Sequence, residues 1–469
     1  MPYDSLKALI ADLEKDGSLQ HVPIEVDPAW EVAAVMRRVF RMPQAQRPAV
    51  LFDRIKGSDL PLVVGLYGSR RTYARILGVT PTRINERWLH ALAHPVPPVF
   101  VSGGPCKEVV LRGEAVDLTR FPVPTWTPGR DIAPYIAGAS VVTRDPESHV
   151  RNVGIYRLQL KGRDRTGLNI NPPQHIGIHS RKYRARGQPM QVAMALGADP
   201  VVSMVAAAKF PPDTDEFAIA GGLRGAPLEL VKCETVDLEV PATAEIVIEG
   251  TADLEHLEPE APFGEYMGYM SPQRLNPVLR VTAVTCQRRA IFHALLSQKP
   301  PSESSMLRGI SNEASLLGAL RGMGVKGVTD VHVTEPGGAV MHVVVAIQKL
   351  HPAHPREVMT AVWGVRPYYG KQVIVVDDDI DIRDPFDVEW AVATTVQARR
   401  DLVIIPDHTG RRSDLSVEPE RRDLDRSDKL GVDATRKWPY PAPAGAGPEH
   451  LARVEARWPE YGIREVERE

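Results

Sequence analysis

The middle third of the chain is a series of short β-branched and alternating runs, each ended by proline, glycine or aspartate. Examples are ASVVTRD, VGIYRLQLKG, ETVDLEVPATAEIVIEGTADL and PVLRVTAVTCQ. Proline cannot donate to a sheet ladder, so it is confined to the edges, bulges and loops of β structure. The chain has 42 prolines, about twice the usual share of roughly 5%. Residues 112–297 are therefore expected to form a β-barrel-like or sandwich body with a few helical insertions.

After residue 303 the pattern changes to helices that alternate with strands. The segment SESSMLRGISNEASLLGALRGM predicts a helix with Ser302 as N-cap, and it places Glu303 and Glu313 in helix-start contexts. Strands are predicted at VKGVTDVHVTE, AVMHVVVAIQKL and KQVIVVDDDIDIRD, with PREVMTAVWGV as a crossover helix. This alternation is typical of a smaller α/β domain. The last segment, about 60 residues rich in Arg, Asp and Pro, predicts an extended tail that ends in a short helix.

Composition and charge exclude several classes of protein. The formal net charge is -2, so neither nucleic acid nor an anionic membrane is an expected partner. The three cysteines are widely separated and have no metal-type spacing, which favours buried thiols in a reducing compartment. The N-terminal segment carries acids and is no signal peptide, and no apolar run approaches the ~20 residues of a membrane span. We expect a soluble cytoplasmic protein.

Two carboxylates flank a Pro-Phe-Gly turn in the stretch EPEAPFGEYMGYMSP. Glu260 and Glu265 lie there among small, apolar and aromatic residues. An apolar pocket favours the neutral form of a carboxylic acid, and a nearby Arg⁺ holds a second one ionised. Two such acids and one Arg can deliver and remove a proton near neutral pH. A turn with two ordinary surface glutamates would account for the spacing equally well.

Other polar residues occur beside rigid turns. The run RNVGIYRLQL places Asn152 and Arg157 on a strand, an odd number of residues apart and hence on opposite faces unless a bulge intervenes. A surface charge is the commoner role of an Arg in a strand. The run NPPQHIGIHS places His175 after a Pro-Pro and His179 four residues later. Such a His pair on a helix can bind a metal, but the rest of a zinc signature is missing.

The loop FPPDTDE adds Asp213, Asp215 and Glu216, although most acidic loops are simply solvated. One Asn oxygen, one imidazole and one Glu would give Mn²⁺ or Mg²⁺ a mixed oxygen and nitrogen shell, with open positions for a phosphate. The sequence contains neither a GxxxxGK[ST] cradle nor a GxGxxG after a strand. A nucleotide-like cofactor would therefore be held partly through the metal.

Five separated motifs follow one another in a fixed order: NVGIYR, PQHI, PPDTDE, LELVKC and EAPFGEYMGY. Later in the chain come VIVVDDDID, GVDATRKWP and ARWPEYGI. In this order the chain resembles the UbiD-type decarboxylases, from about residue 5 to about residue 465. It departs from their pattern at Ala261, where many members have Gly, and at KFPPDTDE, where some have a Met-Pro loop. Neither departure changes a charged group, so only details of pocket shape are affected.

The resemblance implies a mixed α/β (α+β) fold. An N-terminal cofactor-binding domain with a split β-barrel would be linked to a C-terminal α/β dimerisation domain. The implied divisions are an N-terminal α/β segment (1–111), a split-barrel core for prenylated FMN (112–300), a linker helix (301–320), and a C-terminal domain with tail (321–469). Members of the family commonly assemble as dimers or hexamers, so a homo-oligomer is expected, and a flavin prenyltransferase would supply the cofactor.

The resemblance also implies roles for individual residues. Those that match the ligands of a divalent metal, Mn²⁺ or Mg²⁺ with K⁺ as a further ion, are Asn152, His175 and Glu216. Those that match the catalytic network are Arg157, Glu260 and Glu265. Further contacts to the cofactor are implied for Ile155, Arg157 and Gln174, with Arg366 and Lys371 as looser candidates for its phosphate.

The implied reaction is the reversible, non-oxidative decarboxylation of a small aromatic or heteroaromatic acid. Substrate carbon would bond covalently to prenylated FMN, which accepts electrons as CO₂ departs. Glu265 would donate the proton that replaces CO₂, with Arg157 holding Glu260 ionised. Apolar neighbours of Glu265 would keep water out.

The substrate side of the pocket would come from His293, Met306 and Arg308. An Arg there can anchor a second polar group on the ring, although a charge on the helix surface is at least as common. Three alternatives stay open at this point. The first is a 4-hydroxy-3-polyprenylbenzoate decarboxylase, and the second is an FMN-dependent oxidoreductase that turns over NAD(P)H. The third is a structural subunit of a carboxylase complex.

Overall fold

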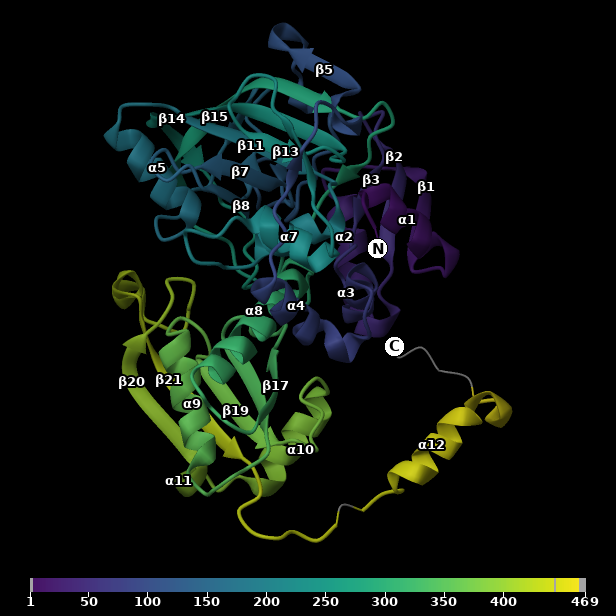
Figure 1. Cartoon of the computed structure of the whole chain (residues 1–469), viewed down its shortest axis with the longest axis vertical. Coiled ribbons are helices and arrows are strands. Elements are labelled where there is room, and N and C mark those ends of the chain that lie inside the picture. The colour runs from purple at the N-terminus through teal and green to yellow at the C-terminus, as the bar shows by residue number, and fades with distance from the viewer. Residues whose placement is uncertain (1–2, 443, 464–469) are drawn as a thin grey trace.

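The computed structural model describes residues 3–442 and 444–463. Figure 1 shows two bodies joined by a long helix, α8, with the N-terminal and middle thirds of the chain in the upper body. The fold is mixed α/β, as the sequence predicts. The domain boundaries stay predictions, and their outer ends, residues 1–2 and 464–469, lie outside the described part.

A four-stranded sheet in the upper body combines the start of the chain with a strand from much later. Its order is β1-β2-β3-β16, with β1 parallel to β2, β2 antiparallel to β3, and β3 parallel to β16. The bounds in this region are α1 (Leu6–Lys15), β1 (Leu19–Val26), α2 (Glu31–Val39), β2 (Ala49–Ile55), β3 (Leu62–Val64), α3 (Arg70–Leu77), α4 (Ile84–Ala93) and β16 (Phe292–His293).

The larger sheet of the upper body has seven antiparallel strands, in the order β10-β15-β14-β11-β7-β8, with β5 also paired to β15. The bounds are β5 (Val109–Arg112), β7 (Ser140–Arg144), β8 (Arg151–Ile155), β10 (Arg165–Gly167), β11 (Met190–Leu196), β14 (Ile246–Glu260) and β15 (Arg274–Cys286). The register of β14 and β15 runs from Ile246 opposite Cys286 to Glu260 opposite Arg274. The tip of this hairpin, residues 261–273, therefore carries most of the Glu-rich motif.

Three helices and two small sheets complete the upper body. They are α5 (His175–Ala185), α6 (Pro200–Ala207), α7 (Glu216–Arg224), the sheet of β4 (Val99–Phe100), β12 (Glu229–Lys232) and β13 (Glu239–Pro241), and the pair β6 (Tyr135–Ile136) and β9 (Leu158–Gln159). Among the described residues, no helix has the length and apolar character that a membrane crossing requires.

The lower body is a five-stranded sheet in the order β17-β18-β19-β21-β20. Its elements are α8 (Glu303–Gly322), β17 (Val328–Val333), β18 (His342–Ile347), α9 (His354–Val365), β19 (Gln372–Asp377), α10 (Pro385–Thr395), α11 (Ala398–Asp401), β20 (Leu402–Thr409) and β21 (Arg426–Ala434). The last helix, α12 (Pro448–Ala456), stands apart from this body in Figure 1. Alternate residues of β18 point to opposite faces. Val343 and Val345 pack with α8 and α9, whereas Val344 and Ala346 pack with α10.

Two expectations for the C-terminal third are wrong. The residues after 410 are not only an extended tail, because Arg426–Ala434 forms β21 between β19 and β20. The strand was not predicted because it contains polar residues. One of them, Lys429, is buried, and its Nζ donates to the carbonyl oxygen of Pro367 at 2.8 Å. Glu313 lies in the middle of α8 rather than near its start, where it pairs with Arg70.

The start of α8 is anchored to the upper body by a buried carboxylate. Ser302 caps the helix in a capping box with Ser305. The next residue, Glu303, has an exposed fraction of 0% and accepts backbone N–H bonds from Gly65 (3.0 Å), Tyr67 (2.9 Å) and Leu296 (3.3 Å). Burial raises its pKa to about 7, against the opposing effect of these three donors. The helix that joins the two bodies therefore begins at a titratable group.

We predict that Glu303→Gln flattens the pH dependence of stability. Between pH 4.5 and about 7 the folded chain holds a proton on Glu303 that the unfolded chain releases. The stability that this proton contributes is present at low pH and lost as the pH rises through 7. The unfolding free energy of the wild type relative to the variant should thus fall by about 2.5 kcal/mol from pH 5 to pH 8. Urea unfolding at both pH values measures it, and parallel pH profiles would contradict it.

Candidate active site

A buried Arg–Glu pair lies where the long hairpin ends. Glu260 is the last residue of β14 and has an exposed fraction of 0%. Arg157 donates to both of its carboxylate oxygens, from Nε to Oε1 at 2.9 Å and from Nη2 to Oε2 at 3.0 Å. Asn276, on β15, donates from Nδ2 to Oε2 at 3.1 Å. The buried carboxylate is thus held in one orientation by a bidentate cation and an amide.

The same guanidinium also reaches the second acid. Arg157 Nη1 pairs with Glu265 Oε1, and Nη2 donates to Ser271 Oγ at 3.3 Å. Its Cζ lies 4.8 Å from the centroid of the Phe263 ring. Burial opposes the charge, but the carboxylates of Glu265 and Glu260 outweigh it and raise the pKa of Arg157. Arg157 is therefore a permanent cation shared by two acids.

Arg157 does not lie on a strand, contrary to expectation. β8 ends at Ile155 and β9 begins at Leu158, so Arg157 is in the connection between them. Strand alternation consequently does not set the direction of its side chain, and the inference of opposite faces for Asn152 and Arg157 does not apply.

The two acids have different surroundings. The side chain of Glu265 is 35% exposed, so its apolar neighbours do not shield it from water as expected. Tyr269, one of those neighbours, is 63% exposed, and its carbonyl oxygen accepts the N–H of Glu265 at 2.8 Å. At the start of the tip, Ala261 has φ of 74°, a left-handed conformation that favours glycine.

The three candidate metal ligands come from three elements. Asn152 lies on β8, His175 is the first residue of α5, and Glu216 is the first residue of α7. His175 Nδ1 is 3.7 Å from Glu216 Oε1. Glu216 Oε2 accepts the N–H of Val153 at 3.0 Å, and Asn152 Nδ2 donates to Tyr156 OH at 3.4 Å. The fold therefore gathers an amide, an imidazole and a carboxylate.

These residues fit a divalent metal and a polar ligand. Burial raises the pKa of Glu216, while His175 and the Val153 N–H oppose it. Gln174, the N-cap of α5, has a buried Oε1 without a hydrogen-bond partner among the described residues. In the same part of the chain no three His, Cys, Asp or Glu side chains form a metal-type group, so an ion here would need the Asn152 amide. Oxygen and nitrogen donors of this kind suit Mn²⁺ or Mg²⁺.

Two neighbouring residues of the motifs have structural roles. His179 Nδ1 bonds to Thr143 Oγ1 at 2.9 Å, and burial lowers its pKa to about 4, so it is a neutral core residue rather than the partner of His175. Asp215 caps α7, where its Oδ1 accepts the N–H of Phe217 at 3.1 Å.

The candidate substrate residues lie in different environments. Arg308 stacks on Tyr266, with Cζ 3.9 Å from the ring centroid, and so reaches the residue next to Glu265. Met306 is buried in the core of the upper body. His293 is 1% exposed, and neither ring nitrogen has a partner among the described residues; burial lowers its pKa to about 4.

Two of the remaining candidates for cofactor contact, Lys371 and Arg366, already contact other residues of the protein. Ile155 is half-buried at the end of β8. Lys371 pairs with Asp414 at 2.8 Å, and Arg366 lies 5.8 Å from the Tyr369 ring centroid.

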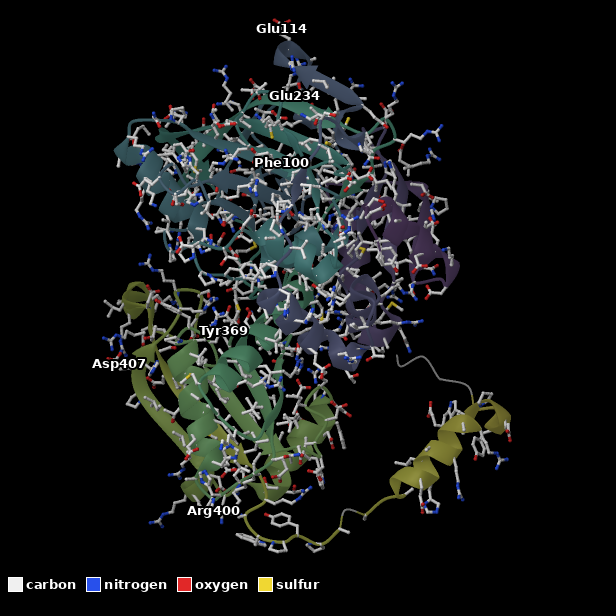
Figure 2. All side chains as sticks on the ribbon, viewed as in Figure 1. Phe100, Glu114, Glu234, Tyr369, Arg400 and Asp407 are labelled. Atoms are coloured by element: carbon white, nitrogen blue, oxygen red, sulfur yellow. The ribbon has the colours of Figure 1, made fainter. Side chains whose placement is uncertain are left out.

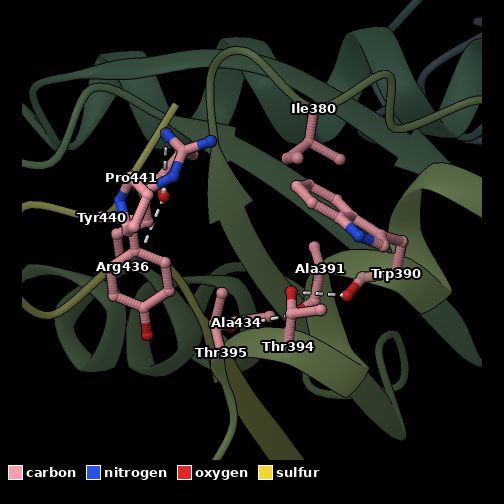
Figure 3. Close-up of a pocket in the computed structure, with 10 residues that line it drawn as sticks. Ile380, Trp390, Ala391, Thr394, Thr395, Ala434, Arg436, Tyr440 and Pro441 are labelled. Atoms are coloured by element: carbon pink, nitrogen blue, oxygen red, sulfur yellow. Dashed lines mark hydrogen bonds and ion pairs between the residues drawn. The ribbon is translucent and has the colours of Figure 1, made fainter. Parts of the chain in front are cut away.

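A separate hollow in the lower body, between α10 and the chain after β21 (Figure 3), is lined by Ile380, Trp390, Ala391, Arg436, Tyr440 and others, and by none of the candidate site residues.

Sequence reasoning missed Phe263, Ser271 and Asn276, which all contact Arg157 or Glu260. Phe263 and Ser271 fall inside the quoted motif, where they gave no separate signal. Asn276 could have been found only from the hairpin register, which pairs it with Glu258.

Three family models match successive parts of the chain. They are the N-terminal domain (residues 10–92), the Rift-related domain (99–300) and the C-terminal domain (305–434) of 3-octaprenyl-4-hydroxybenzoate carboxy-lyase. These matches support a carboxy-lyase as the class of protein. The chain belongs to the UbiD family.

Solved structures support this membership. The UbiD-class enzyme HmfF from Pelotomaculum thermopropionicum, in complex with FMN, is 40% identical, with a TM-score of 0.89 over 96% of this chain and 99% of that one. An evolved dimeric form of HmfF in complex with prFMN is 39% identical, with a TM-score of 0.86 over 95% and 98%. The 3,4-dihydroxybenzoic acid decarboxylase of Enterobacter cloacae is 27% identical, with a TM-score of 0.87 over 97% and 100%.

We predict that Arg157→Met destabilises the fold, because it leaves the fully buried Glu260 without its cation. Loss of one member of a buried pair costs about 3–5 kcal/mol. Replacing both members, in Arg157→Met/Glu260→Leu, removes the unpaired charge and should recover at least half of that loss. Urea unfolding of the two variants checks this expectation, and equal instability would refute it.

Proposed function

We propose that the chain is a prenylated-FMN-dependent decarboxylase of a small aromatic or heteroaromatic carboxylic acid, acting reversibly. The observation that carries this proposal is the sharing of one guanidinium between two unlike acids. Glu260 is fully buried and bidentate to Arg157, whereas Glu265 is partly open to water. Such a set suits the transfer of one proton to a carbon that has lost CO₂.

The proposed cofactor site is formed by the three candidate metal ligands and Gln174. Asn152, His175 and Glu216 would hold Mn²⁺ or Mg²⁺, which would neutralise the cofactor phosphate. The buried Gln174 Oε1 has no hydrogen-bond partner among the described residues and would accept a further contact. When bound, prenylated FMN supplies an electron sink for the charge left by departing CO₂.

The proton would move through Glu265. Its 35% exposure lets the carboxylate take a proton from water, and its place at the hairpin tip lets it pass that proton to substrate carbon. Once Glu265 is again a carboxylate, Arg157 stabilises it through Nη1. Glu260 keeps the guanidinium oriented through its bidentate contact, so that the same cation faces Glu265 before and after the proton moves.

The alternatives differ in chemistry. An FMN-dependent oxidoreductase would have no use for the Arg157–Glu260–Glu265 set, and a structural subunit would have no use for the orphaned Gln174 acceptor. A polyprenylated substrate would need a long apolar groove. Support for a small acid comes from relatives such as the 3,4-dihydroxybenzoic acid decarboxylase. We also propose a homo-oligomer, and a flavin prenyltransferase as supplier of the cofactor.

The test is to co-express the chain with a flavin prenyltransferase and to analyse the released cofactor by absorbance and mass, with metal by elemental analysis. Prenylated FMN with manganese, and CO₂ release from members of an aromatic-acid panel, are the expected results. Ordinary FMN that NAD(P)H reduces would favour the oxidoreductase. Absence of any flavin would favour the structural subunit.

We predict that Glu265→Gln slows CO₂ release at least ~100-fold, because the proton donor is lost, while the bound cofactor keeps its spectrum. Glu258→Gln is the matched control: Glu258 lies on β14, just before the hairpin tip that carries Glu265, and pairs with Lys161 and Arg165. This variant should release CO₂ at nearly the wild-type rate. Turnover of Glu265→Gln above a tenth of the wild-type rate would remove Glu265 from this role.

A further inference from the structure

A short segment of the upper body, residues 126–135, lies against the hairpin tip. It accepts two backbone N–H groups from the start of the tip: Asp131 Oδ1 accepts the N–H of Gly264 at 3.1 Å, and Tyr135 OH accepts the N–H of Ala261 at 3.1 Å. We call this segment the tip cradle. The backbone at the start of the tip is therefore attached to the cradle by hydrogen bonds.

The tip cradle is itself closed by hydrogen bonds. Asp131 Oδ2 accepts the N–H of Thr127 at 2.6 Å, and the N–H of Asp131 donates to the carbonyl oxygen of Thr127 at 2.9 Å. Trp126 is buried, and its Nε1 donates to the carbonyl oxygen of Tyr135 at 3.1 Å. The Asp131 carboxylate thus uses one oxygen to hold the cradle together and the other to hold the tip.

The tip also packs closely on the cradle. A Cβ atom at Gly264 would lie 2.3 Å from Thr127 Oγ1, so only glycine allows this approach. The ring centroids of Tyr135 and Phe263 are 4.6 Å apart. Close packing therefore prevents the tip from moving toward the cradle, and the bond from Gly264 to Asp131 resists movement away from it.

Gly264 directly precedes the proposed proton donor, Glu265. The N–H of Glu265 donates to the carbonyl oxygen of Tyr269 at 2.8 Å, and its own carbonyl oxygen accepts the N–H of Gly268 at 2.8 Å. The side chain of Glu265 is 35% exposed and pairs with Arg157. Because the turn after Glu265 is tied to itself, a displacement of Gly264 would carry the Glu265 carboxylate away from Arg157.

The lower body contacts the same tip through a side chain. Arg411 Nη1 donates to Tyr266 OH at 2.8 Å, and its guanidinium lies 5.5 Å from the Tyr369 ring centroid. Figure 2 places Tyr369 at the edge of the lower body that faces the upper one. A tyrosine side chain can rotate about its own bonds, so this contact restrains the Tyr266 ring more than the backbone beside it. The backbone restraint on the residue before Glu265 comes from Asp131.

Asp131 is a third acid near the guanidinium of Arg157. Burial raises the pKa of Asp131, whereas the N–H groups of Thr127 and Gly264 and the charge of Arg157 oppose this effect. Both carboxylate oxygens accept backbone N–H groups. This environment suits an acid that holds the backbone rather than one that carries a proton.

We propose that Asp131 is a positioning residue for the decarboxylation. Its carboxylate holds the N–H of Gly264 and thereby keeps the carboxyl group of Glu265 beside Arg157, where it can give its proton to the substrate carbon. This inference rests on the proposed function. Because Asp131 acts on the proton donor and not on bound substrate, its loss should lower kcat and leave KM nearly unchanged.

The first measurement is hydrogen–deuterium exchange of the chain purified after co-expression with a flavin prenyltransferase, which requires no turnover. Asp131→Ala removes the acceptor of the Gly264 N–H, so peptides of the tip, residues 261–273, should exchange at least ~10-fold faster. Asp117→Ala is the matched control, because Asp117 is also half-buried and its Oδ1 accepts the N–H of Thr119 at 3.1 Å. This variant should leave exchange at the tip unchanged.

The second measurement is steady-state CO₂ release by the same variants. Asp131→Ala should lower kcat at least ~10-fold and change KM less than about twofold, with an unaltered cofactor spectrum, and Asp117→Ala should behave as the wild type. In a double-mutant cycle, Asp131→Ala combined with Glu265→Gln should be no more than about twofold slower than Glu265→Gln alone, because both changes impair the same proton transfer. Asp131→Asn keeps one acceptor oxygen, so its loss of kcat should be smaller.

Unchanged exchange at the tip in the Asp131 variants would overturn the proposal, because Asp131 would then not hold the tip. Losses of kcat that multiply in the cycle would overturn it as well, since Asp131 would then act independently of Glu265. Asp131→Asn is the substitute in both measurements if Asp131→Ala fails to fold. Faster exchange at the tip without CO₂ release by the wild type from any acid would support the hold of Asp131 on the tip while contradicting the proposed function.

Discussion

A carboxylate with no exposure to water needs a cation, and the candidate site is built around that need. Glu260 is placed by the last pairing of the long hairpin, and Arg157 by the short connection between β8 and β9. Because an unpaired charge there would cost several kcal/mol, the hairpin end and the connection must keep their relative positions. The pair thereby fixes a guanidinium with one nitrogen free for Glu265. The cation that the buried Glu260 requires, Arg157, therefore also orients the more accessible acid, Glu265.

The lower body and α8 add positively charged side chains, which the hairpin tip itself lacks. α8 is anchored at its start by the bonds of Glu303 and in its middle by Glu313, which pairs with Arg70 of the upper body and contacts His332 and Arg383 of the lower one. This anchoring brings lower-body arginines to Tyr266, beside Glu265. Upper-body residues thus supply the acids and the candidate metal ligands, whereas Arg308 on α8 and Arg411 of the lower body contact Tyr266.

Much of the fold could be predicted from local signals. The start of α8 was predicted correctly, because Ser302 caps the helix as its sequence indicates. Strands with continuous apolar runs were also correct. The strand β21 was missed, because its buried Lys429 and Asp433 are satisfied by partners distant in sequence or by local turns, which no local pattern reveals. The position of Arg157 was misjudged because strand ends depend on pairing rather than on composition. Asn276 was missed because it meets Glu260 only through the hairpin register.

The most direct measurement is a double-mutant cycle on CO₂ release by the cofactor-loaded enzyme, with Arg157→Lys, Glu265→Gln and the double variant. If Arg157 acts on catalysis through Glu265, the two single losses overlap, and the double variant is little slower than the slower single variant. If the two losses instead multiply, Arg157 and Glu265 act independently, and the account of a shared guanidinium that orients the proton donor is wrong.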